Sequence, residues 1–227
     1  GETAGWERAN WFAREGQERE YRYDWGPQNW FDNAREEHQS VREGVGLFDL
    51  STFGKIRVEG ADALPFLQHV CANDMNVEPG KIVYTQMLNG RGGIESDLTV
   101  TRLGDTSFLL VVPAATIRRD MAWLQRHVPA GAHVTVFDNT SGEAVIALMG
   151  PQSRELLNRV SPDGFTNDVH PFGTAREIEA LINEPELHER LARARVGAQA
   201  VRRGQAGLRR TWRVLSLRPV RTQVNAV

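Results

Sequence analysis

The stretch NGRGGIESDLTV, residues 89–100, contains the carboxylate best placed to do chemistry. If residues 94–100 form a strand, alternate side chains share a face, so Glu95, Asp97 and Thr99 lie on one side of the sheet. Aspartate is unfavourable inside a strand unless its face is solvated or functional. Periodicity leaves two alternatives open: a sheet with one wet face, or a wall that faces a ligand and presents Asp97 to it.

Other polar and aromatic residues limit the chemistry further. Tyr84 is expected on the neighbouring strand, where it could stack on a flat ligand or serve as an ordinary cross-strand aromatic. The glycines Gly90, Gly92 and Gly93 join two strands and open no helix, so they shape a turn and do not hold a phosphate. The histidines lack ligand spacing and the segment TSGEA offers no exposed nucleophile, so neither a metal site nor a Ser-His-Asp hydrolase is expected.

Composition predicts a globular protein. The 227 residues are 41% hydrophobic, which is enough for a core, and the net charge of −2 gives no reason to expect nucleic acid or a membrane as partner. The single cysteine, Cys71, excludes an internal disulfide and is expected as a buried free thiol in a reducing compartment. No apolar run approaches the ~20 residues that span a bilayer, and the N-terminus differs from a signal peptide, so a cytoplasmic protein is expected.

The N-terminal segment and the helix after it are expected to differ in character. Residues 1–33 carry four of the six tryptophans without a steady period, which predicts an extended segment whose aromatic rings are buried on another surface. Asn33 as N-cap, with Glu36 three residues later, predicts that a helix follows. A short strand is expected next, in VGLFDLS.

The middle of the chain predicts alternating strands and helices. FGKIRVEG has the pattern of a half-buried strand, and ADALPFLQHV that of a helix with Asp62 near its start. Residues 81–112 predict three consecutive antiparallel strands, followed by the helix PAATIRRDMAWLQRHV and the strand AHVTVFDN. A strand in EAVIALMG, a helix in PQSRELLNRV with Pro151 just inside its start, and a strand from HPFGTAREIE follow. This order predicts an α+β fold of antiparallel sheets with packed helices.

The pattern changes after about Glu179. Arginine, glycine and alanine dominate, and no acidic residue occurs between Arg190 and Val227. A basic tail of this kind could bind RNA, but it lacks the interleaved aromatic residues typical of such sites. A solvated tail without regular structure is therefore expected.

Five motifs occur in the order of a known family between residue 5 and about residue 179: GWERANWFA, VGLFDLS, VYTQMLNGRGGIESDLTVTRL, MGPQSRELL and PFGTAREIE. They resemble the folate-binding C-terminal region of sarcosine and dimethylglycine dehydrogenases, which is related to the aminomethyltransferase (T-protein) of the glycine cleavage system. The resemblance implies a partial T-protein-like folate-binding fold with a ferredoxin-like inserted domain. Residues 1–55 plus 141–179 would form an incomplete discontinuous folate-binding domain, 56–140 the inserted α+β domain, and 180–227 a divergent arginine-rich tail.

The resemblance also assigns roles to residues. In the family, the acid of the SDLTV segment lies close to the reactive nitrogens of tetrahydrofolate, so Asp97 is the implied catalytic residue. Tyr84 would line the pterin pocket, Thr99 could hydrogen-bond the ligand, and Val111 would make a main-chain contact. A carboxylate suits the reaction, because transfer of carbon from an iminium to a folate amine needs the amine held close, deprotonated as it attacks, and the developing cation stabilised.

Three parts of the family pattern are not matched in the sequence. These are the strand pair with a GELGWE-like segment, a separate C-terminal β-rich domain after it, and the FAD-binding domain that precedes the folate region. We expect a fragment with a changed reading frame after residue 180, which would explain the first. The expected function is the tetrahydrofolate-binding, methylene-transfer portion of a sarcosine or dimethylglycine dehydrogenase-like enzyme. Its partners would be folate, an iminium derived from an N-methyl amine, and a flavin domain or subunit. The alternative is a non-catalytic folate-fold binding module or an inactive fragment.

Overall fold

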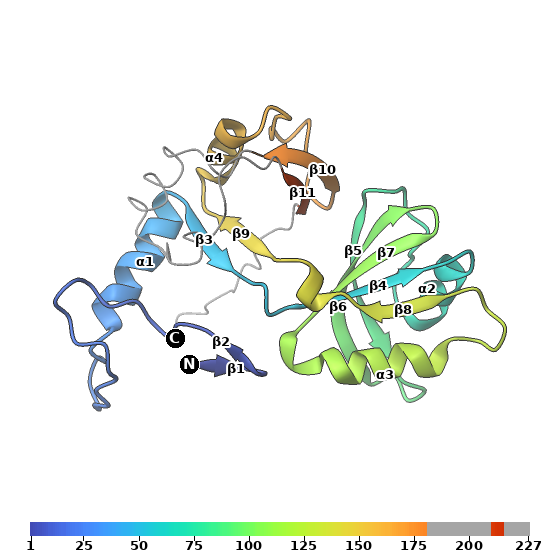
Figure 1. The fold of residues 1–227 in the computed structure, drawn as a ribbon, viewed down its shortest axis with the longest axis horizontal. Helices are drawn as coiled ribbons and strands as arrows, with labels where there is room; N and C mark the ends of the chain where they lie inside the picture. Colours follow the sequence, from blue (N-terminus) through green and yellow to red (C-terminus); the bar gives the residue numbers. More distant parts are fainter. Residues whose placement is uncertain (181–209, 216–227) are drawn as a thin grey trace.

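A five-stranded antiparallel sheet is the largest element of the computed structural model, which describes residues 1–180 and 210–215. Its strands are β4 (Gly54–Glu59), β5 (Ile82–Leu88), β6 (Ile94–Gly104), β7 (Ser107–Val112) and β8 (Thr135–Asp138). They lie in the order β5-β6-β7-β4-β8, so the predicted three-strand meander is confirmed and forms one half of the sheet (Figure 1).

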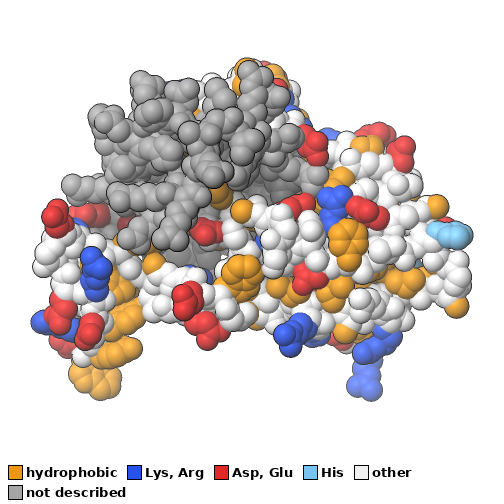
Figure 2. Space-filling model, in the orientation of Figure 1, with side chains coloured by type: hydrophobic (Ala, Val, Ile, Leu, Met, Phe, Trp, Pro, Cys, Tyr) orange, Lys and Arg blue, Asp and Glu red, His pale blue; other side chains and the backbone are white. Residues whose placement is uncertain are grey.

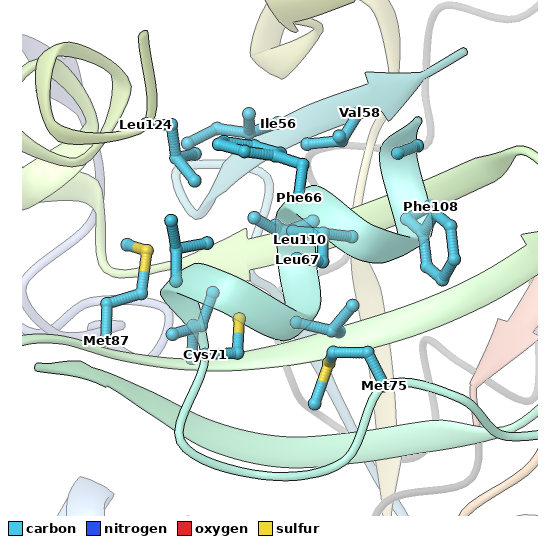
Figure 3. Close-up of a cluster of buried hydrophobic side chains, with 14 of the residues drawn as sticks. Ile56, Val58, Phe66, Leu67, Cys71, Met75, Met87, Phe108, Leu110 and Leu124 are labelled. Carbon is cyan, nitrogen blue, oxygen red and sulfur yellow. The ribbon is translucent and has the colours of Figure 1, made fainter. Parts of the chain in front are cut away.

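Two helices pack against one face of this sheet. They are α2 (Ala63–Val70), which begins directly after Asp62 and so confirms that this residue lies near the helix start, and α3 (Ile117–His127), which follows a short 3-10 turn. Figure 3 shows their apolar side chains meeting those of the strands, and Phe66, Leu110 and Leu124 are all almost completely buried there. Because side chains alternate along each strand, this core occupies one face of the sheet and leaves the other for different contacts.

A second group of elements includes α1 (Phe31–Glu43), α4 (Ser153–Val160) and the antiparallel pair of β3 (Gly46–Asp49) with β9 (Ile146–Met149). The chain leaves this group after β3, builds the five-stranded sheet, and returns to it at β9 (Figure 1). Pro151 lies just before α4 instead of inside it, a shift of the kind expected at helix ends.

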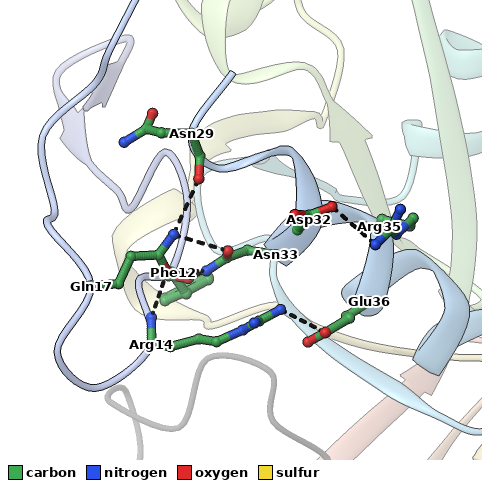
Figure 4. A network of polar contacts seen from close by, with 8 residues as sticks. All are labelled: Phe12, Arg14, Gln17, Asn29, Asp32, Asn33, Arg35 and Glu36. Atoms are coloured by element: carbon green, nitrogen blue, oxygen red, sulfur yellow. Dashed lines mark hydrogen bonds and ion pairs between the residues drawn. The ribbon is translucent and has the colours of Figure 1, made fainter. Parts of the chain in front are cut away.

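The N-cap prediction for Asn33 is wrong. Helix α1 begins at Phe31 with Trp30 at its N-cap, and Asn33 lies inside the first turn, 6% exposed. Its amide donates to the Phe12 carbonyl at 2.7 Å and to the Gln17 side-chain carbonyl at 2.8 Å (Figure 4). These tertiary hydrogen bonds to the N-terminal segment outweigh the local preference of asparagine for a capping position.

The N-terminal segment is extended as predicted, with a small hairpin of β1 (Glu2–Thr3) and β2 (Trp6–Glu7). The expected burial of its aromatic rings is wrong at Trp25 and Tyr23, which are exposed. Figure 2 shows hydrophobic side chains gathered at the lower left, the end of the molecule where this segment lies in Figure 1.

One strand falls inside the predicted arginine-rich tail. Strand β11 (Arg210–Leu215) pairs antiparallel with β10 (Ala175–Ala180), so the expectation of a tail without regular structure does not hold for these six residues. The remainder of the predicted tail, 181–209 and 216–227, lies outside the described residues. Within 1–180 and 210–215, no helix is long and apolar enough to cross a membrane.

Candidate functional site

Three of the four residues singled out from the sequence form a row across the sheet. Tyr84 on β5 is the direct cross-strand partner of Thr99 on β6, and Thr99 is in turn the partner of Val111 on β7. Adjacent strands lie about 4.8 Å apart, so the row is roughly 10 Å long. Its side chains lie on the face opposite the core, where Tyr84 is 58% exposed.

Asp97 lies beside this row, two residues before Thr99 on the same face of β6. Its direct partner is Gln86, whose amide donates to the Asp97 carboxylate at 3.4 Å. Tyr84, diagonal to Asp97, also contacts it: a hydrogen bond to the Asp97 side chain is the main reason that the pKa of Tyr84 is raised, and an opposing bond from Gln86 offsets part of the effect. Asp97 is exposed, whereas its neighbours Ser96 and Leu98 are buried on the core face.

The turn before Asp97 is organised by Asn89. Its side-chain oxygen accepts hydrogen bonds from the backbone N–H of Arg91 and of Gly93, each at 3.0 Å, and its amide donates to Glu95 at 2.8 Å. Gly92 has a φ of 78°, in the left-handed region that glycine adopts without a steric penalty. The glycines therefore shape a turn, as predicted, and Glu95 is engaged in that turn beside Asp97.

A buried lysine extends the row beyond Val111. Lys55 on β4 is the cross-strand partner of Val111, is 1% exposed, and donates from Nζ to the Ser51 carbonyl at 2.8 Å. Burial lowers the pKa of Lys55, and the nearby carboxylates, Glu143 foremost, oppose that effect. Nothing in the sequence singled out Lys55, although the alternation in FGKIRVEG put it on the polar face of its strand.

The segment that follows α4 reaches the edge of the sheet at β5. The Gly173 carbonyl accepts a hydrogen bond from the Ile82 N–H at 2.9 Å, and the preceding residue, Phe172, is half-exposed. Thr101, two residues beyond Thr99 on the same face, is fully buried there. Phe172 is a second residue that the sequence analysis did not single out, although the motif PFGTAREIE contains it.

The described part of this face contains neither a cluster of metal-ligating side chains nor a thiol. Within the part of the chain that the structure describes, no three His, Cys, Asp or Glu side chains are grouped so that they could hold a metal ion. Cys71 belongs to the core beneath the opposite face, and burial raises its pKa to about 12. The thiol is therefore the buried free cysteine that the sequence predicted, and it is protonated at neutral pH.

The arrangement suits a flat ligand that carries a basic nitrogen. Asp97 supplies an exposed carboxylate that can accept a proton or face a developing cation, and Gln86 and Tyr84 hold it by hydrogen bonds. Tyr84 supplies an exposed aromatic face, and Thr99 a hydroxyl that can donate or accept. An aromatic ring, a hydroxyl and a carboxylate are thus present together on one face of the sheet.

The fold is that of an α+β protein of the aminomethyltransferase type. The solved aminomethyltransferase T of the glycine cleavage system from Bartonella henselae superimposes with a TM-score of 0.55 at 27% identity, and the match covers 71% of this chain and 45% of that one. The sequence pattern of the GCVT N-terminal domain matches residues 1–185. The chain belongs to this family, which confirms the resemblance drawn from the motifs.

Named relatives include both oxidising and transferring enzymes. The chain is 46% identical to 4-methylaminobutanoate oxidase (formaldehyde-forming) from Paenarthrobacter nicotinovorans, over 79% of this chain and 22% of that protein. It is 32% identical to the mitochondrial dimethylglycine dehydrogenase of Rattus norvegicus, over 78% and 20%, and 41% identical to an aminomethyltransferase of Chlorobaculum parvum, over 63% and 42%. The chain thus spans about a fifth of the oxidase and of the dehydrogenase, and about two fifths of the aminomethyltransferase.

Proposed function

We propose that the chain forms the tetrahydrofolate-binding, one-carbon-transfer portion of an enzyme that oxidises N-methyl amines. The observation that carries this proposal is the shared face of Asp97, Tyr84, Thr99 and Val111, with Tyr84 and Gln86 both in contact with the carboxylate. The relatives support it, because two of them are named for the oxidation of methylated amines and a third for aminomethyl transfer. FAD would belong to a separate domain or subunit.

The residues would divide the work as follows. Oxidation of an N-methyl amine leaves an iminium carbon, and bound tetrahydrofolate would supply the nucleophilic amine that takes it up. The Asp97 carboxylate would accept the proton that this amine loses as the first carbon–nitrogen bond forms, and its charge would stabilise the adjacent cation. The demethylated amine would leave as a second folate nitrogen bonds to the same carbon, so that methylene-tetrahydrofolate and the free amine are the products. Tyr84 would stack on the pterin ring, Thr99 would hydrogen-bond it, and Val111 would contact it through the main chain.

Binding is the first test, because it needs only the chain itself. Isothermal titration with tetrahydrofolate is expected to give a dissociation constant in the micromolar range, and Asp97→Asn to weaken binding about tenfold through loss of a charged hydrogen bond. Asp105→Asn is the matched control: this carboxylate is exposed at the turn between β6 and β7 and is not part of the proposed site. Equal effects of the two substitutions, or no binding to the unaltered chain, would refute the proposal.

Transfer is the second test, in the longer protein that carries the flavin. There Asp97→Ala is expected to abolish methylene transfer, so that amine oxidation releases its carbon as formaldehyde. Unchanged formation of methylene-tetrahydrofolate would remove Asp97 from the mechanism. Folate binding without transfer in the unaltered protein would identify a binding module that has lost the chemistry.

A further inference from the structure

Asp120 on α3 is a buried carboxylate on the far side of the sheet from the proposed folate site. It is 1% exposed, and its Oδ2 accepts hydrogen bonds from the Thr116 hydroxyl at 2.6 Å and the Ser96 hydroxyl at 3.0 Å. Its Oδ1 accepts from the Arg119 guanidinium at 3.4 Å. A carboxylate removed from water destabilises the fold unless such donors replace its hydration, so these partners are required for its burial.

One of these partners is the immediate neighbour of Asp97. Ser96 lies on the core face of β6, 2% exposed, and Asp97 follows it on the opposite face. Because consecutive strand residues share a peptide plane, a bond that fixes the Ser96 side chain also fixes the backbone from which Asp97 projects. The hydrogen bond from Ser96 to Asp120 therefore links the helix layer to the backbone of the proposed catalytic residue.

Strand β6 has few other constraints at this point. Its pairing with β7 begins only at Thr99, so within the described sheet Asp97 is flanked by β5 alone. The pairing with β5 is itself irregular nearby, with a register shift between Met87 and Leu88. Irregular pairing at a sheet end re-aims side chains, so the backbone at Asp97 requires a further anchor to keep one orientation.

We propose that Asp120 is a positioning residue for Asp97 and acts through Ser96. The role rests on the proposed function, in which the Asp97 carboxylate meets the folate amine, because a carboxylate displaced by about 1 Å loses much of its effect on a reacting group. Asp120 does not touch the ligand. It holds the first residues of β6, which no residue of β7 pairs with, in one position.

Two substitutions separate this role from simple stabilisation of α3. Ser96→Ala and Thr116→Val each remove one hydroxyl donor from the same Asp120 oxygen, but only the first removes the link to β6. If Asp120 served merely to hold α3, both variants would lower the melting temperature and neither would move Asp97. Asp120→Asn is a third variant, which keeps the side-chain shape and weakens both bonds.

The position of Asp97 can be read through Tyr84 without any ligand. The chain has three tyrosines, so labelling with carbon-13 at tyrosine Cζ gives three NMR signals, and Tyr84→Phe assigns the one that reports the contact with Asp97. The Tyr84 signal is expected to shift toward its position in Asp97→Ala when Ser96→Ala or Asp120→Asn is introduced. In Thr116→Val it is expected to stay where it is in the unaltered chain.

Folate binding provides the second measurement. Ser96→Ala is expected to raise the dissociation constant for tetrahydrofolate about fivefold, and Thr116→Val less than about twofold. An unmoved Tyr84 signal in Ser96→Ala, or an equal shift in Thr116→Val, would overturn the positioning role. If the unaltered chain binds no folate but the Tyr84 signal responds as expected, the proposed function fails while the structural link from Asp120 to Asp97 stands.

Discussion

The phenol of Tyr84 and the carboxylate of Asp97 are diagonal neighbours across β5 and β6, and a hydrogen bond between them raises the pKa of Tyr84. Tyr84 therefore stays protonated and remains a donor at neutral pH. Together with the Gln86 amide it holds the carboxylate on an otherwise open face. Under the proposed function, a folate amine that reaches Asp97 would meet an oriented anion, and orientation in advance is what makes such a group effective in proton transfer.

The contact between Tyr84 and Asp97 predicts a titration shift. Replacing Asp97 by alanine removes both the acceptor of the phenol hydrogen bond and the negative charge beside it, so the pKa of Tyr84 is expected to fall toward its ordinary value. Carbon-13 NMR of the labelled tyrosines as a function of pH measures this directly. Tyr21 and Tyr23, which stack on one another in the N-terminal segment, provide the internal control signals.

A buried histidine predicts how stability depends on pH. His170 is 3% exposed, and burial, followed by the positive charges of Arg176 and Arg154, lowers its pKa. As the pH falls below the ordinary histidine value, the unfolded chain takes up a proton before the folded chain does. The free energy of unfolding therefore decreases as the pH falls from neutrality to the lowered pKa of His170.

His170→Gln is expected to flatten this dependence. The measurement is the free energy of unfolding by urea at several pH values on the acidic side of neutrality, compared as a slope, since the substitution also changes the absolute stability. His69→Gln is the control, because His69 is exposed at the end of α2. A slope that stays the same in His170→Gln would show that other groups govern the acid sensitivity.

Much of the sheet and its core could be predicted from the sequence, because strand and helix periodicities are local signals that survive in the fold. The alternation in IESDLTV separates Leu98 and Val100, which are buried, from Asp97, which is exposed. The motifs then placed Tyr84, Thr99 and Val111, which the strand register joins in one row. Their roles toward a ligand stay predictions.

Tertiary contacts account for what the sequence did not predict. Lys55 lies in the same row as Val111, but nothing local indicates that a lysine on the polar face of a strand will be buried. Asp120 has the pattern of a polar residue on an amphipathic helix, and its link to Ser96 depends on how α3 packs on the sheet. Asn33 fails as an N-cap for the same reason, since its partners are on a distant segment.

Two glycines with positive φ provide a test of the sheet scaffold. Gly92, in the turn before β6, has a φ of 78° and open space where a Cβ would lie. Gly92→Ala is therefore expected to lower the free energy of unfolding by about 1 kcal/mol, the penalty of an alanine in the left-handed conformation. Gly60, after β4, has a φ of 133°, and a Cβ there would lie 1.9 Å from the His133 carbonyl oxygen. Because that atom belongs to the backbone, it cannot turn aside, and Gly60→Ala is expected to cost about 3 kcal/mol or more. Urea unfolding of both variants measures the difference, and equal losses would contradict the close approach of the two backbone segments.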